Sequence, residues 1–330
     1  MKRDGIAANI AKLFQPVLVS SRMLGRMSRV RNNEEQRRRA GILLFELVTT
    51  GGLAAMINDI VVNLSVGAKA NSAGDYAISL ATALNAHLTG IIFLYGPTMP
   101  VSRAGYVPPE LEVIERHNEA AVEAARESFI AASTRAGVKA EFLTVSASLV
   151  SAGDQFGQIA RCFDLAVVGQ AGPETNMLEE NIIEAALFDS GGPVIIVPYI
   201  QKTPLKLDHI MVCWDASRAA ARAIRDAMPF LRRAGRIEVV IVTNERGKQH
   251  QIERPDIGAH LTRHGLNVAI RRMPLGDVDV ASLLLSHAAD EDVDFIVMGG
   301  YGHSRLREFV LGGVTRSMLR TMTAPVLMSH

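Results

Sequence analysis

The chain has 330 residues, a formal net charge of +1 and a hydrophobic content of 48%, with only 5% aromatic residues. This length is sufficient for two domains of ordinary size, and apolar residues that are largely Ala, Val, Ile and Leu favour α/β layers over an all-β sandwich. The near-zero charge gives no reason to expect a nucleic-acid partner. Two isolated cysteines, Cys162 and Cys213, argue against a disulfide framework and are expected to be buried thiols of a cytoplasmic protein.

No segment of the chain is predicted to span a membrane. The closest approach is Ala40–Ile57, which Glu46, Gly51 and Gly52 interrupt. The basic residues at the amino terminus are not followed by an apolar core of signal-peptide length either. These observations agree with the cytoplasmic location expected from the cysteines.

Residues 1–55 are predicted to be a basic extension. Residues 1–39 contain ten Lys or Arg residues and three acidic residues, a net charge of 10 − 3 = +7. Three interpretations are open: a disordered arm with weak affinity for anionic surfaces, a short amphipathic helix around Ile10–Leu18, or a mis-assigned start. Pro16 argues against the helix, and Met56, directly before the first predicted strand, favours the mis-assigned start.

Residues 56–200 are predicted to form a first α/β domain. Short apolar runs predict its strands, and helical periodicity fills the intervals between them. The expected elements are strands at Ile60–Leu64, Thr89–Leu94, Lys139–Val145, Leu165–Val168 and Val194–Val197, with a long helix at about Pro109–Ala136.

Residues 201–330 are predicted to form a second domain, which begins with a connector that contains Pro204. Its expected strands are His209–Trp214, Ile237–Val242, Val268–Arg272, Phe295–Met298 and Pro325–Met328. Its expected helices are Ala219–Leu231, about Asp256–His264, Val280–Ala289 and Val314–Thr321.

The two domains are predicted to be copies of one unit. Continuous apolar strands that alternate with helices imply a parallel sheet covered on both faces. Right-handed crossovers then make a five-stranded doubly wound sheet the default topology. The corresponding segments are Asp59–Gly67 with His209–Ser217, Asp164–Gly172 with Asp294–Gly302, and Gly191–Tyr199 with Thr323–His330.

A glycine pattern near the carboxyl terminus is the most informative motif. Gly299 and Gly302 end an apolar run as G-x-x-G, and Gly312 and Gly313 follow after nine further residues, directly before a helical stretch. Glycine lets a ligand approach the backbone closely, and the free N–H groups at a helix start suit a phosphate. The pattern therefore predicts a strand, a glycine-rich loop and a helix around an anionic ligand.

The spacing G-x-x-G-x9-G resembles the nucleotide-binding signature of the universal stress protein family, and the resemblance extends over about Met56–His330 as two tandem domains. It implies the fold of that family, α/β with doubly wound five-stranded parallel sheets of the adenine nucleotide α-hydrolase-like type and strand order 3-2-1-4-5. In the family Ser or Thr follows the third glycine, whereas this chain has Gly313 there and Thr315 two residues later.

The resemblance also implies a site for ATP, with or without Mg²⁺, in the second domain. Asp215 ends the first strand of this domain and Gly299 ends the fourth, so both are expected at the switch point of the sheet, where ligands bind in such folds. Asp215 can also stabilise the turn before Ser217. The residues implied in nucleotide binding are Asp215 for the adenosine part, the backbone of Val242 for the base, and Gly299, Gly302, Gly312, Gly313 and Thr315 for the phosphates.

The first domain is expected to have lost this site. Ser65 stands in place of Asp215, and Ile182 stands in place of the third glycine. Carboxylates near the helix start that would receive the phosphate repel an anion. These carboxylates belong to Glu179, Glu180 and Glu184.

We therefore expect a cytoplasmic universal stress protein that binds ATP or a related adenine nucleotide in its carboxyl-terminal domain, has an unknown protein partner and is not a metabolic enzyme. Two alternatives stay open: a nucleotide-free dimeric interaction module, which Gly313 favours, and a slow ATPase, for which no general base is apparent. The resemblance implies that the fifth strands, Val194–Val197 and Val326–Met328, pair antiparallel and make an intramolecular pseudo-dimer, since open sheet edges invite pairing. Homodimers of whole chains are a further expectation.

Overall fold

The computed structural model describes residues 57–65, 71–95, 109–172, 177–243, 256–300 and 313–330. The predictions for the basic extension, residues 1–55, and for Gly302 and Gly312 therefore lie outside the described residues. The part of the chain from Ala54 to His330 forms one compact unit. The proposed boundaries at residues 55/56 and 200/201 stay predictions.

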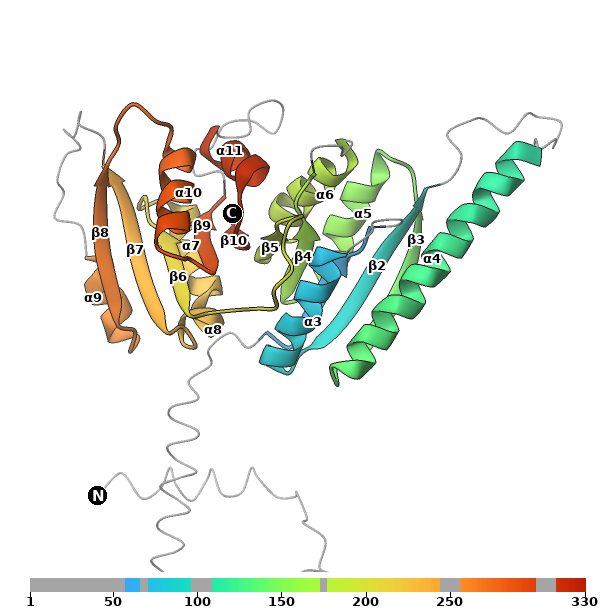
Figure 1. The fold of residues 1–330 in the computed structure, drawn as a ribbon, viewed down its shortest axis with the longest axis horizontal. Helices are drawn as coiled ribbons and strands as arrows, with labels where there is room; N and C mark the ends of the chain where they lie inside the picture. Colours follow the sequence, from blue (N-terminus) through green and yellow to red (C-terminus); the bar gives the residue numbers. More distant parts are fainter. Residues whose placement is uncertain (1–56, 66–70, 96–108, 173–176, 244–255, 301–312) are drawn as a thin grey trace, which may run out of the picture. The chain divides into compact units, whose positions relative to one another are not determined.

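Ten strands form one sheet in the order β3-β2-β1-β4-β5-β10-β9-β6-β7-β8 (Figure 1). Each half of this sheet has the order 3-2-1-4-5 when its strands are numbered along the chain, so the predicted doubly wound topology is confirmed twice. The strands are β1 (Asp59–Asn63), β2 (His87–Tyr95), β3 (Ala140–Ala147), β4 (Leu165–Gly169), β5 (Val194–Val197), β6 (His209–Cys213), β7 (Arg236–Thr243), β8 (Val268–Pro274), β9 (Phe295–Gly299) and β10 (Val326–Ser329).

Helices follow most strands and cover both faces of the sheet. One hydrophobic cluster lies between the sheet and α3, α4, α7, α8 and α9, and a second lies between the sheet and α5, α6, α10 and α11. The helices are α3 (Ser72–Leu84), α4 (Pro109–Arg135), α5 (Ser151–Ala160), α6 (Met177–Phe188), α7 (Arg218–Asp226), α8 (Met228–Leu231), α9 (Ile257–Arg263), α10 (Val280–Asp290) and α11 (Gly313–Thr321).

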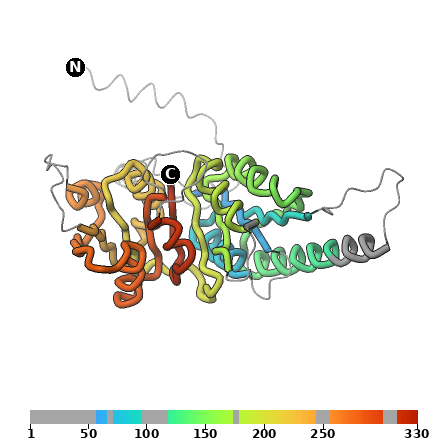
Figure 2. Tube along the Cα trace, turned by 90° about the horizontal axis from the view of Figure 1, so that it is seen from above, coloured from blue at the N-terminus to red at the C-terminus, as the bar shows by residue number. Residues whose placement is uncertain are grey.

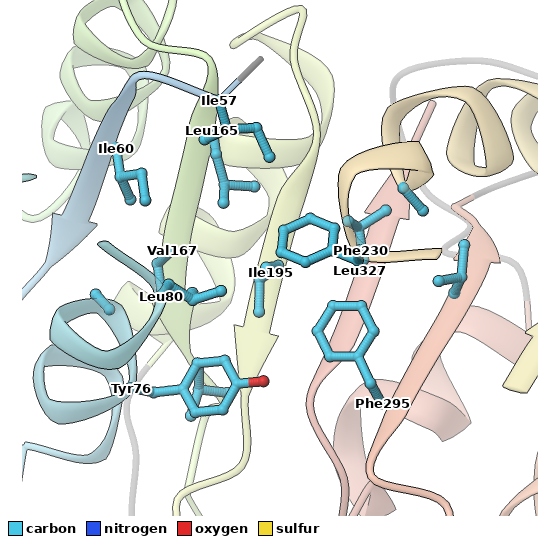
Figure 3. Close-up of a cluster of buried hydrophobic side chains, with 14 of the residues drawn as sticks. Ile57, Ile60, Tyr76, Leu80, Leu165, Val167, Ile195, Phe230, Phe295 and Leu327 are labelled. Atoms are coloured by element: carbon cyan, nitrogen blue, oxygen red, sulfur yellow. The ribbon is translucent and has the colours of Figure 1, made fainter. Parts of the chain in front are cut away.

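The two halves join where β5 pairs antiparallel with β10, and Leu327 lies opposite Ile195. The predicted antiparallel pairing of the two fifth strands within one chain is therefore confirmed. A single core crosses the junction, since Ile195 and Tyr76 of the first half belong to the same cluster as Phe230 and Leu327 of the second (Figure 3). Seen from above, the carboxyl terminus lies at the junction between the halves (Figure 2).

The repeated Asp before the fourth strand of each half has a structural role. The backbone amide of Asp164 donates to Asp59 O at 3.0 Å, and its carboxylate accepts from the amide of Asp59 at 3.1 Å. In the second half Asp294 makes the same two contacts with His209, each at 3.0 Å. Each aspartate therefore sets the register between the first and fourth strands, which is where a doubly wound sheet reverses its order.

Polar caps and one proline set the ends of several helices. Ser217 accepts from the amide of Ala220 at 3.0 Å at the start of α7, and Asp279 accepts from the amide of Ala281 at the start of α10. The predicted continuous helix Ala219–Leu231 is wrong, because α7 ends at Asp226 and α8 begins at Met228. Pro229 has no N–H for a helical hydrogen bond, so the chain restarts in a separate turn.

The exposure of one cysteine differs from the expectation. Cys162 is exposed, so the expectation of two buried thiols is wrong for this residue. Cys162 lies in the turn between α5 and β4, where the chain passes over the surface. In the described part of the chain, no helix combines the length and the apolar character that crossing a membrane requires.

Candidate functional site

The carboxyl ends of three adjacent strands, β9, β6 and β7, form the candidate site in the second half. β6 lies between the other two, with Cys213 opposite Val240 of β7 and Val212 opposite Val297 of β9. The chain leaves β6 into α7 and returns in β7, whereas β9 lies on the other side of β6. This is the switch point at which such sheets bind ligands. Asp215, just after β6, and Gly299, the last residue of β9, both lie there.

Asp215 lies in the turn between β6 and α7. Its Oδ1 atom accepts from the amide of Ser217 at 2.9 Å, and Ala216 between them has φ of +61°. The side chain of Asp215 is exposed. The carboxylate therefore stabilises the turn with one oxygen atom and remains accessible to a ligand, so the two predicted roles are compatible.

Gly299 ends β9 and contacts the first turn of α7. A Cβ atom at this position would lie 2.7 Å from the carbonyl carbon of Ala219 and closer still to the amide nitrogen of Ala220. Any side chain would push α7 away from β9, because atoms in packed interiors cannot approach that closely. Gly299 thus brings the helix that follows Asp215 against the strand that leads to the glycine-rich segment.

The other glycines of the motif differ in what the structure shows. Gly313 is the first described residue of α11 and is exposed. Among the described residues, no side chain and no backbone atom from outside α11 lies within 4 Å of the position that its Cβ would occupy. Thr315, two residues later, is buried with 4% of its surface exposed. Acidic residues are absent from the first turn of α11 as described, which leaves the positive end of the helix dipole uncompensated there.

Val242 and Trp214 lie beside the same edge, and both are partly buried. Val242 is paired with Met273 of β8 and packs with the cluster under α10 and α11. Trp214 is partly exposed and packs against the other cluster. Burial, with a contribution from the negative charge of Asp215, raises the pKa of the Cys213 thiol to about 12, so this thiol is protonated at neutral pH.

The corresponding edge of the first half has a different character. Glu179 and Glu180 lie in the first turn of α6, and Ile182 is buried inside this helix. Burial and the nearby charge of Glu179 raise the pKa of Tyr95, at the end of β2, to about 12. A Cβ at Gly169 would lie 3.8 Å from the Cβ of Ala73, so the tight strand-to-helix contact of the second half has no counterpart here.

The structure reveals two features that the sequence motif did not include. Ala219 and Ala220 are the partners that pack against Gly299, and their signal was the run Ala219–Ala221, which begins two residues after the cap Ser217. Arg316 is exposed in the first turn of α11, where it adds positive charge to a helix start. A search for basic residues one turn after the last glycine would have found it.

Comparisons with known proteins agree with the fold. Residues 206–330 match the model of the Universal stress protein family. The universal stress protein Slr1230 of Synechocystis sp. (strain ATCC 27184 / PCC 6803 / Kazusa) is 23% identical over 171 residues, which are 50% of this chain and 57% of that protein. The chain thus spans little more than half the length of this curated relative.

Two solved structures resemble the whole described unit. One is a universal stress protein from Archaeoglobus fulgidus DSM 4304, with 17% identity, coverage of 82% of this chain and 97% of that chain, and a TM-score of 0.63. The other is the functionally unknown protein PA1789 from Pseudomonas aeruginosa PAO1, with 15% identity, coverage of 82% and 92%, and a TM-score of 0.53. At these identities the likeness shows the fold.

Proposed function

Because residues 206–330 belong to the universal stress protein family, we propose that this chain binds ATP or a related adenine nucleotide at the carboxyl edge of its second domain, residues 201–330. The first domain, residues 56–200, does not bind nucleotide in this proposal. The chain acts in the cytoplasm as a stress-response binding protein and not as a metabolic enzyme. Its partner is another protein that responds to the nucleotide state.

One observation carries the proposal: Asp215 and Gly299 meet at the switch point of the second half through the first turn of α7. An exposed carboxylate there can accept hydrogen bonds from ribose hydroxyl groups. The backbone of Val242 at the end of the neighbouring strand is then close to the base. This assignment gives each of the three described strand ends one part of the nucleotide: Asp215 the sugar, Val242 the base and Gly299 the phosphates.

The start of α11 fits the phosphates. A Cβ at Gly313 would contact no described residue outside α11, and the described first turn carries Arg316 but no carboxylate. Backbone N–H groups and the helix dipole at such a position favour anions. Gly302 and Gly312 complete the phosphate-binding set in this proposal, and a bound Mg²⁺ would be held mainly by the phosphates.

The contrast between the halves supports a single site. The first turn of α6 contains Glu179 and Glu180, which compensate the helix dipole themselves and repel phosphate. Ser65 replaces the carboxylate of Asp215. We therefore expect one nucleotide for each chain.

The test is to purify the full chain, denature it and identify any released nucleotide by chromatography, followed by titration of the stripped protein with Mg-ATP. Asp215→Ala is compared with Asp290→Ala, which removes an exposed carboxylate from the last turn of α10. ATP bound by the parent and by Asp290→Ala, but lost in Asp215→Ala, is the expected result. A parent that releases no nucleotide and does not bind Mg-ATP would overturn the proposal.

A second candidate function is a nucleotide-free interaction module. Gly313 favours it, because a glycine at this position supplies an N–H group but no hydroxyl for the phosphates. The antiparallel β5–β10 junction already provides the pseudo-dimeric framework within one chain. Absence of nucleotide binding in the titration above would make this module the working model, with its protein partner then sought by pull-down.

A further inference from the structure

The sheet has two outer strands, β3 and β8, one at each end (Figure 1). In the described part of the chain, β3 pairs with β2 alone and β8 pairs with β7 alone. The fifth strands of the two halves, β5 and β10, already pair with each other. Among the described strands, therefore, β3 and β8 are the ones that can extend the sheet into another chain.

β8 carries residues that discourage such pairing. Arg271 and Arg272 are exposed in the middle of this strand, and Pro274 at its end has no N–H group to donate. The Nε atom of Arg271 also lies 2.8 Å from the carboxylate of Glu238 on the neighbouring strand. Charged side chains and proline are the means by which natural edge strands avoid further strands, so β8 is a poor partner for another chain.

β3 lacks this protection. Its sequence contains one charged residue, Glu141 near its start, and no proline. Leu143 in the middle of the strand is 42% exposed, and Leu149 and Val150 in the turn after the strand are exposed as well. A long edge strand with an exposed apolar side chain at its centre favours pairing with a further strand.

The backbone groups of alternate residues in β3 point away from β2. The carbonyl oxygen of Lys139, directly before the strand, accepts from the amide of Leu88 in β2 at 3.1 Å. Because successive residues of a strand direct their hydrogen-bonding groups to opposite sides, the odd-numbered residues of β3 bond to β2 and the even-numbered residues face outward. The outward-facing residues are Ala140, Phe142, Thr144 and Ser146.

This set of outward-facing residues is complementary to itself. When a second copy of β3 lies antiparallel with Leu143 opposite Leu143, Phe142 faces Thr144 and Ala140 faces Ser146, so each outward residue has a hydrogen-bonded partner. A shift by two residues in either direction leaves one of the four without a partner within β3. Glu141 faces Val145 in this register, so no like charges lie opposite each other.

We propose that two chains associate through antiparallel pairing of β3 about a two-fold axis at Leu143. The ten-stranded sheet then continues from one chain into the second, and the same strand contributes from both sides, as an isologous interface requires. Each end of the joined sheet is a β8 strand, which Arg271, Arg272 and Pro274 protect, so the assembly closes at two chains. This interface is independent of nucleotide binding.

The test is sedimentation equilibrium of the full chain and of two variants, Leu143→Lys and Leu143→Glu. The parent should have twice the mass of one chain, whereas each variant alone should have the mass of one chain, because like charges would meet at the two-fold axis. An equimolar mixture of the two variants should restore the dimer, since lysine then faces glutamate. Val278→Lys is the control and should remain dimeric, because it changes an apolar residue of similar exposure between β8 and α10.

A further variant tests the backbone pairing without a charge. Thr144→Pro removes an outward N–H group that β2 does not use, and should weaken the dimer by about tenfold or more, since the two-fold axis doubles the loss. Circular dichroism checks that each variant folds, and restoration of the dimer in the mixture shows it directly.

Four results would each overturn the proposal: a monomeric parent, a dimer that persists in both Leu143 variants, loss of the dimer in Val278→Lys, or a folded mixture that stays monomeric. Hydrogen exchange then identifies the other occupant. Slow exchange of the Phe142 and Thr144 amides in a monomeric parent would assign this edge to a segment of the same chain.

Discussion

Gly299, at the end of β9, lies against the amide nitrogen of Ala220 in the first turn of α7, with no room for a β-carbon between them. The sequence motif predicts that Gly299 lets a ligand approach the backbone, and the packing of α7 against β9 requires a glycine there as well. The same contact holds together the two segments that would bind the nucleotide, so a change at Gly299 is expected to affect both stability and binding.

Gly299→Ala should lower the free energy of unfolding by about 1–3 kcal/mol, because the added methyl group overpacks the contact with Ala219 and Ala220. Gly169→Ala is the matched control in the first half, where the added Cβ would lie 3.8 Å from Ala73, an ordinary contact distance. Its effect should stay within about 0.5 kcal/mol. Urea unfolding measures both, and equal effects of the two variants would contradict the packing role.

Gly313→Ser should increase the affinity for ATP by about fivefold, since the hydroxyl adds a hydrogen bond to a charged phosphate. The substitution fits the described part of the chain, where no residue outside α11 lies within 4 Å of the Cβ position. Gly313→Ala is the control: it fills the same space and supplies no donor, so its ATP affinity should remain that of the parent. An equal change in both variants, measured by calorimetric titration, would assign the effect to the helix backbone and not to the hydroxyl.

Substitutions at Asp215 and Ser217 should distinguish a role in nucleotide binding from a role in capping α7. Ser217→Ala removes the acceptor for the amide of Ala220 and should lower the free energy of unfolding by about 1 kcal/mol. Asp215→Asn keeps an Oδ1 acceptor for the amide of Ser217, so stability should change little, whereas ATP affinity should fall about tenfold through loss of a charged acceptor. Thermal unfolding and titration of both proteins check this, and the reverse pattern would make Asp215 purely structural.

Glu238 should make the stability of the second half sensitive to acid. Its side chain is 2% exposed and accepts from Arg271 Nε at 2.8 Å, with His287 Nε2 at 2.7 Å from its other oxygen. Burial acts to raise the pKa of this carboxyl, but the hydrogen bonds from Arg271 and His287 and their charges outweigh burial and leave the pKa lowered.

A lowered folded-state pKa means that the stabilisation is present above the unfolded pKa of about 4.3 and is lost as the pH falls through the folded pKa. Glu238→Gln should therefore lower the free energy of unfolding by roughly 2 kcal/mol at neutral pH, and the difference from the parent should shrink below pH 4. Chemical unfolding between pH 3 and pH 7 measures it. A difference that does not depend on pH would show that charge is not the cause.

Tyr76→Phe should leave the protein as stable as the parent or raise its free energy of unfolding by about 1 kcal/mol. Tyr76 is 2% exposed, and its hydroxyl has no hydrogen-bond partner among the described residues, so removal of this group relieves an unpaired buried donor. Figure 3 shows the hydroxyl directed toward the second half of the molecule. Burial, together with the charge of Asp294, raises the pKa of Tyr76 well above its usual range. A lower melting temperature in Tyr76→Phe would reveal a partner for the hydroxyl.

Local patterns determined the elements of this protein and their order. Apolar runs predicted all ten strands within two residues at each end, because parallel strands that are buried on both faces read as continuous apolar segments. Each half then followed the predicted order 3-2-1-4-5. The helix prediction failed at Pro229, where one missing N–H group divided a stretch that periodicity alone made continuous.

Only the tertiary structure decided which distant groups meet. The packing role of Gly299 depends on how closely α7 approaches β9. The partnership of Glu238 with His287 joins residues 49 positions apart, and the hydrogen bond from Gln170 Nε2 to Leu319 O joins the two halves beside the β5–β10 junction. Periodicity reports which face of an element is apolar, but it carries no information on the partner that covers that face. The resemblance of the glycine spacing to the universal stress protein signature predicted the residues of the candidate site. The contacts that these residues make in the packed molecule could be known only from the tertiary structure.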